Sequence, residues 1–227
     1  MLLTIRITDI ESVSGLLCAP AHARACYVLA HGAGAGMRHP FLNALSTGLA
    51  NRRIATLRYQ FPFMERGLRR PDSPSVAHAA VRAAIATASD RMPAVPLFAG
   101  GKSFGGRMTS QAQAATALPQ LRGLIFVGFP LHPANKPSQA RAEHLSSVRC
   151  PMLFLQGTRD ELADVALISD LVAVLGDRAT LRLFEGADHA FHVRSRSGQT
   201  DRQVLDALLE ALSGWVADHA GSENVRV

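Results

Sequence analysis

Short apolar runs alternate along this chain with longer stretches of helical periodicity. The runs at the start predict edge strands, and the later ones have the uninterrupted apolar character of buried parallel strands. This alternation predicts an α/β fold: a mostly parallel, eight-stranded sheet with helices on both faces. The predicted strands are 2–8, 13–18, 26–30, 54–59, 97–99, 123–128, 151–156 and 180–184.

Helical patterns fill most of the intervals between these strands. The predicted helices are 41–50, 75–89, 107–117, 161–175 and 203–219, the last with one broad apolar face. Two proline-rich intervals, 60–74 and 129–138, predict irregular loops. The excursion 129–149 is too short for a large lid domain. Because no repeat or linker interrupts the pattern, we predict one domain over 1–220 and a flexible tail at 221–227.

The composition of the chain is that of a protein with one buried core and no membrane helix. Hydrophobic residues make up 48% of 227 residues, which is ample for one buried core. No apolar run approaches the roughly 18–20 residues of a membrane helix, and the N-terminus lacks the pattern of a secretory signal. Three cysteines, Cys18, Cys26 and Cys150, without paired spacing argue against a disulfide framework. We therefore expect a cytoplasmic protein that does not bind membranes.

The formal net charge of +6 raises the question of nucleic-acid binding. The arginines are scattered and aromatic residues are only 6% of the chain, so we expect no nucleic-acid partner. The densest basic segment, MERGLRR at 64–70, predicts a solvated loop; a rim that attracts anions is the alternative.

The segment Gly101-Lys102-Ser103-Phe104-Gly105 matches the pattern G-x-S-x-G between an apolar run and a helical pattern. This context predicts a sharp strand-to-helix turn that lifts the serine above the sheet. Glycines flank the serine because a Cβ there would collide with neighbouring backbone. The following helix directs its free N–H groups at the reacting oxygen, where they favour negative charge. Ser103 is therefore a candidate nucleophile.

Nucleotide binding is the rival interpretation of the glycine-rich segments. A phosphate-binding loop G-x-x-x-x-G-K-[ST] would end at GKS 101–103, but Pro96 stands where its first glycine is needed. The second segment, HGAGAG at 31–36, does not fit G-x-G-x-x-G, and Arg58 stands where a dinucleotide site has an acidic residue. We therefore expect no nucleotide cofactor.

A nucleophilic serine needs a base and a group that orients the base. In sites built on this turn, the chain order is serine, acid, histidine. Asp160 follows one predicted strand in QGTRDEL, and His189 follows the last strand in EGADHAF. We predict His189 as general base and Asp160 as the acid that orients it. Asp164 and His192 are the nearest alternatives, and Asp160 has the alternative role of a helix cap.

An oxyanion hole is expected from two backbone donors. One is the N–H of Phe104, directly after the nucleophile. The other is the N–H of Ala33 in the glycine-rich loop, with Gly34 as the alternative, because small residues there let the backbone approach the reacting oxygen. We expect His31 to hold this loop in place rather than to catalyse.

With these motifs in place, the sequence resembles the α/β-hydrolase superfamily, and most of all its small dienelactone-hydrolase-like members. The shared features are HGAGAG, GKSFGG, QGTRDEL and GADHAF, between residues 31 and 191. It is also similar to the small hydrolase-like domain found in a histone-acetyltransferase complex subunit and in testis-expressed hydrolase-like proteins, which have a similar HGAG start, R-Y-x-F-P stretch and GGKSxGGR turn. Dienelactone hydrolases proper use a cysteine nucleophile, so the serine here does not imply their substrate.

These features predict a hydrolase that cleaves an ester, thioester or related acyl bond of a small molecule, without metal or organic cofactor. The alternative is a hydrolase-shaped binding or scaffold protein with weak turnover. Lys102 and Arg107 predict solvated charges beside the turn; a basic mouth that favours acidic acyl substrates is the alternative. The sequence leaves the oligomeric state open. The expected substrate pocket contains Gly34, Phe61, Pro62, Phe63 and Met64, with Leu131 and His132 on the opposite wall.

Overall fold

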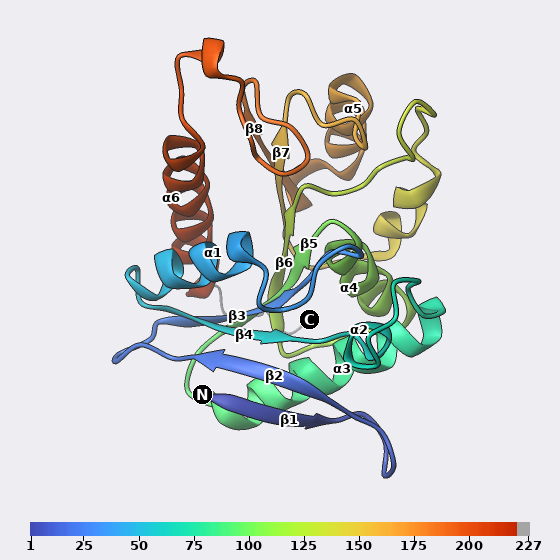
Figure 1. Cartoon of the computed structure of the whole chain (residues 1–227), viewed down its shortest axis with the longest axis vertical. Helices are drawn as coiled ribbons and strands as arrows, with labels where there is room; N and C mark the ends of the chain where they lie inside the picture. The colour runs from blue at the N-terminus through green and yellow to red at the C-terminus, as the bar shows by residue number, and fades with distance from the viewer. Residues whose placement is uncertain (222–227) are drawn as a thin grey trace.

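One eight-stranded sheet forms the centre of the computed structural model, which describes residues 1–221 of the chain (Figure 1). The strands lie in the order β1-β2-β4-β3-β5-β6-β7-β8. The strand β2 pairs antiparallel with β1 and β4, and all pairs from β4 to β8 are parallel. The bounds are β1 Leu2–Arg6, β2 Ser12–Cys18, β3 Ala25–Ala30, β4 Ile54–Tyr59, β5 Leu97–Lys102, β6 Leu121–Val127, β7 Met152–Gly157 and β8 Ala179–Phe184.

Helices cover both faces of this sheet. Figure 1 shows α1 and α6 on one side and α3, α4 and α5 on the other. The α-helices are α1 Pro40–Ala50, α2 Pro62–Glu65, α3 Pro74–Arg91, α4 Phe104–Ala115, α5 Val165–Leu175 and α6 Asp201–Ala220. Short 3₁₀ segments are η1 Ala140–Ser147, η2 Gly176–Arg178 and η3 Ser195–Ser197. The predicted α/β architecture is confirmed, and η1 is the largest element in the excursion between β6 and β7, where no lid domain was expected.

Two apolar cores explain why the central strands have uninterrupted apolar sequences. Along β3, Val28 packs into the core under α3 and α4, whereas Tyr27 and Leu29 pack into the core under α1 and α6. Successive side chains of a strand point to opposite faces, so a strand covered on both sides is apolar at most positions. All six residues of β3 are buried, as are all six of β4 and of β7.

Three local predictions were wrong. The interval 60–74 contains the short helix α2, which begins with Pro62, rather than only loop. The helix after Ser103 begins at Phe104 rather than at Arg107. The helix predicted from residue 161 begins at Val165, because the Asp164 side chain accepts a hydrogen bond from the Leu167 N–H and caps it there.

His31 fixes the loop that follows β3. Its ring is fully buried; Nδ1 donates to the Gly32 carbonyl oxygen at 2.7 Å, and Nε2 accepts from the Phe61 N–H at 3.0 Å. The imidazole is therefore neutral and held at both nitrogens. Burial lowers the pKa of His31 to about 4 from 6.5. The ring ties the glycine-rich loop to the segment after β4, as expected of a structural histidine.

Among residues 1–221, no helix is both long and apolar enough to cross a membrane. Of the predicted tail 221–227, only Gly221 belongs to the described residues, and 222–227 lie outside them.

We expect acid to destabilise this fold through His31. Because its pKa is lower in the folded chain, the unfolded chain takes up the proton first as the pH falls from 6.5 toward 4. The free energy of unfolding then decreases, by up to about 3 kcal/mol from this residue. Urea titrations across this pH range measure the decrease.

The variant His31→Gln keeps a donor and an acceptor but does not titrate, so its loss of stability in acid should be smaller. His22 is exposed, and His22→Asn serves as the control that retains the full loss. An equal loss in His31→Gln and in the unchanged chain would contradict this assignment.

Candidate active site

Ser103 occupies the sharp turn between β5 and α4. Its backbone has φ 51° and ψ −118°, in a region that residues other than glycine rarely adopt. The Ser103 N–H donates to the Val127 carbonyl oxygen at 3.2 Å, which ties the turn to β6. The side chain is partly exposed at the carboxyl edge of the sheet, and the predicted strand–turn–helix context is present.

Two glycines of the motif allow the turn to pack. A Cβ at residue 101 would lie 2.2 Å from the Ala30 carbonyl oxygen, and one at residue 105 would lie 2.5 Å from that of His31. Both distances are far inside van der Waals contact, so no larger residue fits without moving β3. The glycines therefore bring β5 and α4 directly against the strand and loop that carry Ala33.

The His189 imidazole lies between Ser103 and Asp160. Its Nε2 is 2.9 Å from the Ser103 Oγ, and its Nδ1 is 2.7 Å from the Asp160 Oδ2. A carboxylate only accepts, so Nδ1 carries a proton that it donates to Asp160. In the neutral ring, Nε2 then accepts the hydrogen bond from the Ser103 hydroxyl. The structure thus brings together the three side chains that the sequence predicts, after β5, β7 and β8.

Asp160 is buried and held by three donors. Its side chain is 0% exposed, whereas that of His189 is 28% exposed. Besides the His189 bond, Oδ2 accepts from Gln156 Nε2 at 2.5 Å, and Oδ1 accepts from the Leu162 N–H at 2.8 Å. Gln156 is a position that sequence reasoning missed. The only sequence signal is its polar amide at the end of the apolar strand PMLFLQ.

The alternatives to these residues have other partners. Asp164 caps α5, and its N–H donates to His132 Nε2. His192 is exposed and donates from Nδ1 to Asp201 at the start of α6, at 2.7 Å. Neither Asp164 nor His192 joins the hydrogen bonds around Ser103.

Lys102 was predicted as a solvated charge, and the structure corrects this. Its Nζ donates to the His189 carbonyl oxygen at 2.5 Å and lies 5.6 Å from the centre of the Phe191 ring. Burial lowers the pKa of the Lys102 ammonium to about 8, against the opposing attraction of Asp160 and Asp188. Lys102 is the last residue of β5, and its side chain turns inward to hold the loop that carries His189.

Two backbone groups near Ser103 have the places expected for oxyanion donors. Phe104 is the first residue of α4, so its N–H has no acceptor within the helix. Ala33 lies in the loop after β3, and a Cβ on its neighbour Gly32 would be 3.7 Å from the Ser103 Cβ. The loop and the nucleophile are therefore in close contact.

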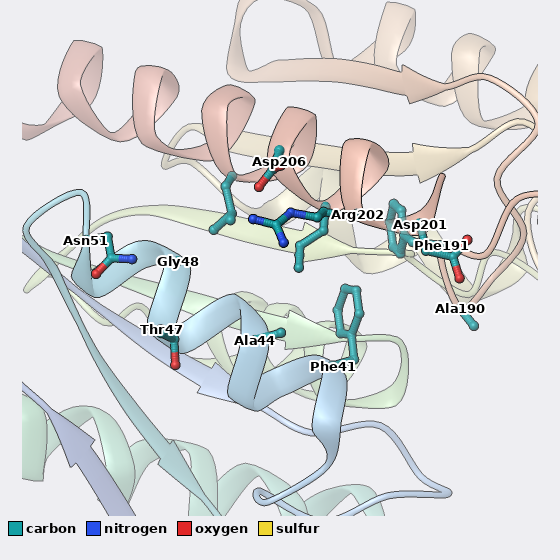
Figure 2. Close-up of a pocket in the computed structure, with 12 residues that line it drawn as sticks. Phe41, Ala44, Thr47, Gly48, Asn51, Ala190, Phe191, Asp201, Arg202 and Asp206 are labelled. Atoms are coloured by element: carbon teal, nitrogen blue, oxygen red, sulfur yellow. The ribbon is translucent and has the colours of Figure 1, made fainter. Parts of the chain in front are cut away.

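Two cavities open at Ser103, and both also contain Ala33 and Leu162. The first, about 320 Å³, extends along the glycine-rich loop toward α1 and includes Gly34 and His189. The second, about 380 Å³, lies on the α4 side and includes Phe104. A larger groove of about 620 Å³ lies between α1 and α6 (Figure 2). It contains neither Ser103 nor His189, so we assign the candidate site to the two smaller cavities.

Six predicted pocket residues lie behind the site rather than in it. None of them lines either cavity at Ser103; five are buried and Met64 is partly buried: Phe61, Pro62, Phe63, Met64, Leu131 and His132. The rings of Phe61 and Phe63 pack edge-on against Phe104 and support it from below. His132 is engaged by the Asp164 N–H at 2.9 Å. Gly34, which follows Ala33 in the glycine-rich loop, was also predicted as a pocket residue and does line the first cavity.

The described residues contain no group of three or more histidine, cysteine or acidic side chains arranged to hold a metal ion. Within the same residues all three cysteines are free, with Cys26 buried and Cys18 and Cys150 partly exposed.

Several solved protein structures have a fold similar to that of this chain. An α/β serine hydrolase without a lid from Xanthomonas campestris has a TM-score of 0.75 and 20% identity, over 98% of this chain and 96% of the other. Dienelactone hydrolase from Anabaena variabilis has a TM-score of 0.74 and 19% identity, over 97% of each chain. Est1E from Butyrivibrio proteoclasticus, bound to ferulic acid, has a TM-score of 0.76 and 14% identity, over 97% and 100%. At these identities the likeness concerns the fold.

The sequence model of a protein family described as alpha/beta hydrolase domain matches residues 23–217. That match covers every strand from β3 to β8 and both cavities at Ser103. The strand order and the helices on both faces agree with it, so the predicted α/β-hydrolase fold without a large lid is confirmed. The chain therefore belongs to the alpha/beta hydrolase domain family.

Proposed function

We propose that this protein is a serine hydrolase that cleaves an ester, thioester or related acyl bond of a small molecule. One observation carries the proposal: His189 bonds through one ring nitrogen to the Ser103 hydroxyl and through the other to the buried Asp160 carboxylate. A serine hydroxyl is a weak nucleophile, and an adjacent base that is itself oriented is what activates it.

In the proposed reaction, Ser103 Oγ attacks the carbonyl carbon while His189 Nε2 takes its proton. The N–H groups of Phe104 and Ala33 hold the negative oxygen of the tetrahedral intermediate. The imidazolium then protonates the leaving alcohol or thiol, and the acyl group remains on Ser103. Water, deprotonated by the same imidazole, attacks this acyl-enzyme and releases the acid.

Asp160 would keep the imidazole in the reactive tautomer and stabilise it when it becomes charged. Gln156 and the Leu162 N–H fix the carboxylate, so Asp160 cannot turn away when His189 moves its proton. Lys102 would position His189 through the carbonyl bond without touching the substrate.

Neighbours of the same fold support acyl-bond cleavage over other chemistry. They include an esterase domain from Rhodothermus marinus, with a TM-score of 0.72 and 15% identity. The motifs that this chain shares with dienelactone-hydrolase-like proteins point the same way, whereas the proposed similarity to the domain in the histone-acetyltransferase complex subunit concerns the fold. As further parts of the proposal, residues 1–220 act as one domain in the cytoplasm, with a small molecule rather than nucleic acid or membrane as partner.

A fluorophosphonate probe should label the chain at Ser103, because the probe needs an activated serine. Ser103→Ala should abolish labelling and lower kcat/KM for p-nitrophenyl esters by at least about a thousandfold. Mass spectrometry of the labelled peptide and a screen of esters of graded acyl length provide the measurements.

Ser110 is the matched control. It forms a second serine–histidine pair, but it is buried and its Oγ donates to the Arg107 carbonyl oxygen at 2.9 Å, so it accepts from His144 Nε2 at 2.7 Å and is not activated by it. Ser110→Ala should therefore leave labelling and turnover intact. If the unchanged chain is neither labelled nor active on any ester, the hydrolase-shaped binding or scaffold protein becomes the better interpretation.

Asp160→Asn should lower kcat by about 10⁴-fold, because an amide favours the wrong tautomer of His189. It should also lower the free energy of unfolding by about 1–3 kcal/mol, because its NH₂ group meets a donor, either Gln156 Nε2 or the Leu162 N–H. Steady-state kinetics and thermal unfolding measure the two effects. Asp164→Asn is the control: asparagine also caps helices well, so both activity and stability should stay near those of the unchanged chain. Equal activity in the two variants would remove Asp160 from the mechanism.

A further inference from the structure

Ser103 stands between two cavities of different chemistry. Both contain Ala33, Ser103 and Leu162. The first continues along small and apolar residues of the loop after β3 and α1, including Phe41 and Leu42. The second continues along α4 and η1 and includes two arginines, Arg107 and Arg141. An acyl substrate has two halves on either side of its carbonyl carbon, and the two cavities offer each half its own surroundings.

Arg107 lies one helical turn after the candidate nucleophile. Its N–H donates to the Ser103 carbonyl oxygen at 3.1 Å, and both residues line the second cavity. Arg141 lines the same cavity from η1. Both side chains are partly buried.

Neither guanidinium makes an ion pair or a hydrogen bond with any group of residues 1–221. The Nε of Arg107 is fully buried and has no partner there. The two arginines also act on each other: burial, and then the charge of Arg141, lower the pKa of Arg107. Two neighbouring like charges, one of them with its Nε out of water, are costly unless an anion meets them.

The other ionisable groups around this cavity do not supply that anion. Asp72 lines it, but its Oδ2 accepts from the Phe63 N–H at 2.6 Å and its Oδ1 is paired with Arg66. His144 packs against α4 on the same side. Burial, followed by the charge of Arg107, lowers the pKa of His144 to about 4, so it is neutral at pH 7. The cavity therefore keeps an excess of positive charge beside Ser103.

The position of His189 indicates which half of the substrate each cavity would bind. The leaving group must lie within reach of His189 Nε2 to receive its proton. His189 lines the first cavity and not the second. The leaving alcohol or thiol therefore belongs in the first cavity, and the acyl chain in the second, with the arginines.

We propose that the second cavity is an acyl site in which Arg107 and Arg141 bind a carboxylate at the far end of the acyl chain. The substrate class is then the half-ester or half-thioester of a dicarboxylic acid. This assignment rests on the proposed hydrolase function. A guanidinium presents its N–H groups in a planar fork that matches a carboxylate. The unpaired arginines thus become paired when the substrate binds.

The test compares monoethyl adipate with diethyl adipate, which has the same acyl chain but no charge, in a pH-stat at pH 7. The unchanged chain should have a kcat/KM for the half-ester at least about tenfold above that for the diester. Arg107→Gln and Arg141→Gln should each reduce this ratio about tenfold, and Arg107→Lys should keep part of it, because lysine retains the charge but loses the fork.

Arg6→Gln is the control. Arg6 is exposed on β1, at the far edge of the sheet, so the ratio should not change. A ratio near one in the unchanged chain, or a ratio that survives both glutamine variants, would overturn the acyl site while ester hydrolysis itself stands.

A binding measurement tests the anion site independently of whether the protein hydrolyses esters. In Ser103→Ala, calorimetry should find monoethyl adipate bound at least about tenfold more tightly than diethyl adipate, and Arg107→Gln in the same background should remove the difference. If neither ester is turned over but this binding preference is present, the anion site stands and the acyl-transfer chemistry does not. Equal binding of the two esters would reject the anion site.

Discussion

The arrangement of the site depends on the two hydrogen bonds that the His189 imidazole makes, one with Ser103 and one with Asp160. The imidazole joins a hydroxyl after β5 to a carboxylate after β7, and it comes itself from the loop after β8. These three segments meet only because their strands are parallel and end at the same edge of one sheet. Neighbouring groups fix the orientation of the ring. Lys102 donates to the His189 carbonyl oxygen, and Gln156 and the Leu162 N–H donate to the Asp160 carboxylate that the ring faces.

Much of this arrangement was predictable because it follows from local pattern. Strands buried on both faces are mostly apolar; the bounds of β4 were predicted to the residue, and those of β3 and β7 to within one residue. The turn at Ser103 has glycines wherever β3 or its loop comes too close for a Cβ, and the motif records those collisions. Asp160 and His189 were placed by chain order and by their position after strands. The structure then brought them within hydrogen-bond distance.

The errors have a different origin, since they depend on where segments far apart in the chain meet. Phe61 and Phe63 are apolar residues in a proline-rich segment, a pattern that fits a pocket wall as well as a core. Only the packing of α2 beneath Phe104 decides for the core. Lys102 looked solvated, but β5 extends to it and its ammonium turns toward the last loop. The start of α5 was set by a single side chain, that of Asp164, which composition does not single out.

The backbone of Ser103 bears on why this residue is a serine at all. At φ 51° a side chain costs of the order of 1–3 kcal/mol, whereas glycine adopts the same conformation without that penalty. Glycine at 103 would thus remove this cost together with the hydroxyl that His189 contacts. The turn therefore carries a hydroxyl at the expense of stability, which supports the nucleophilic role proposed for Ser103.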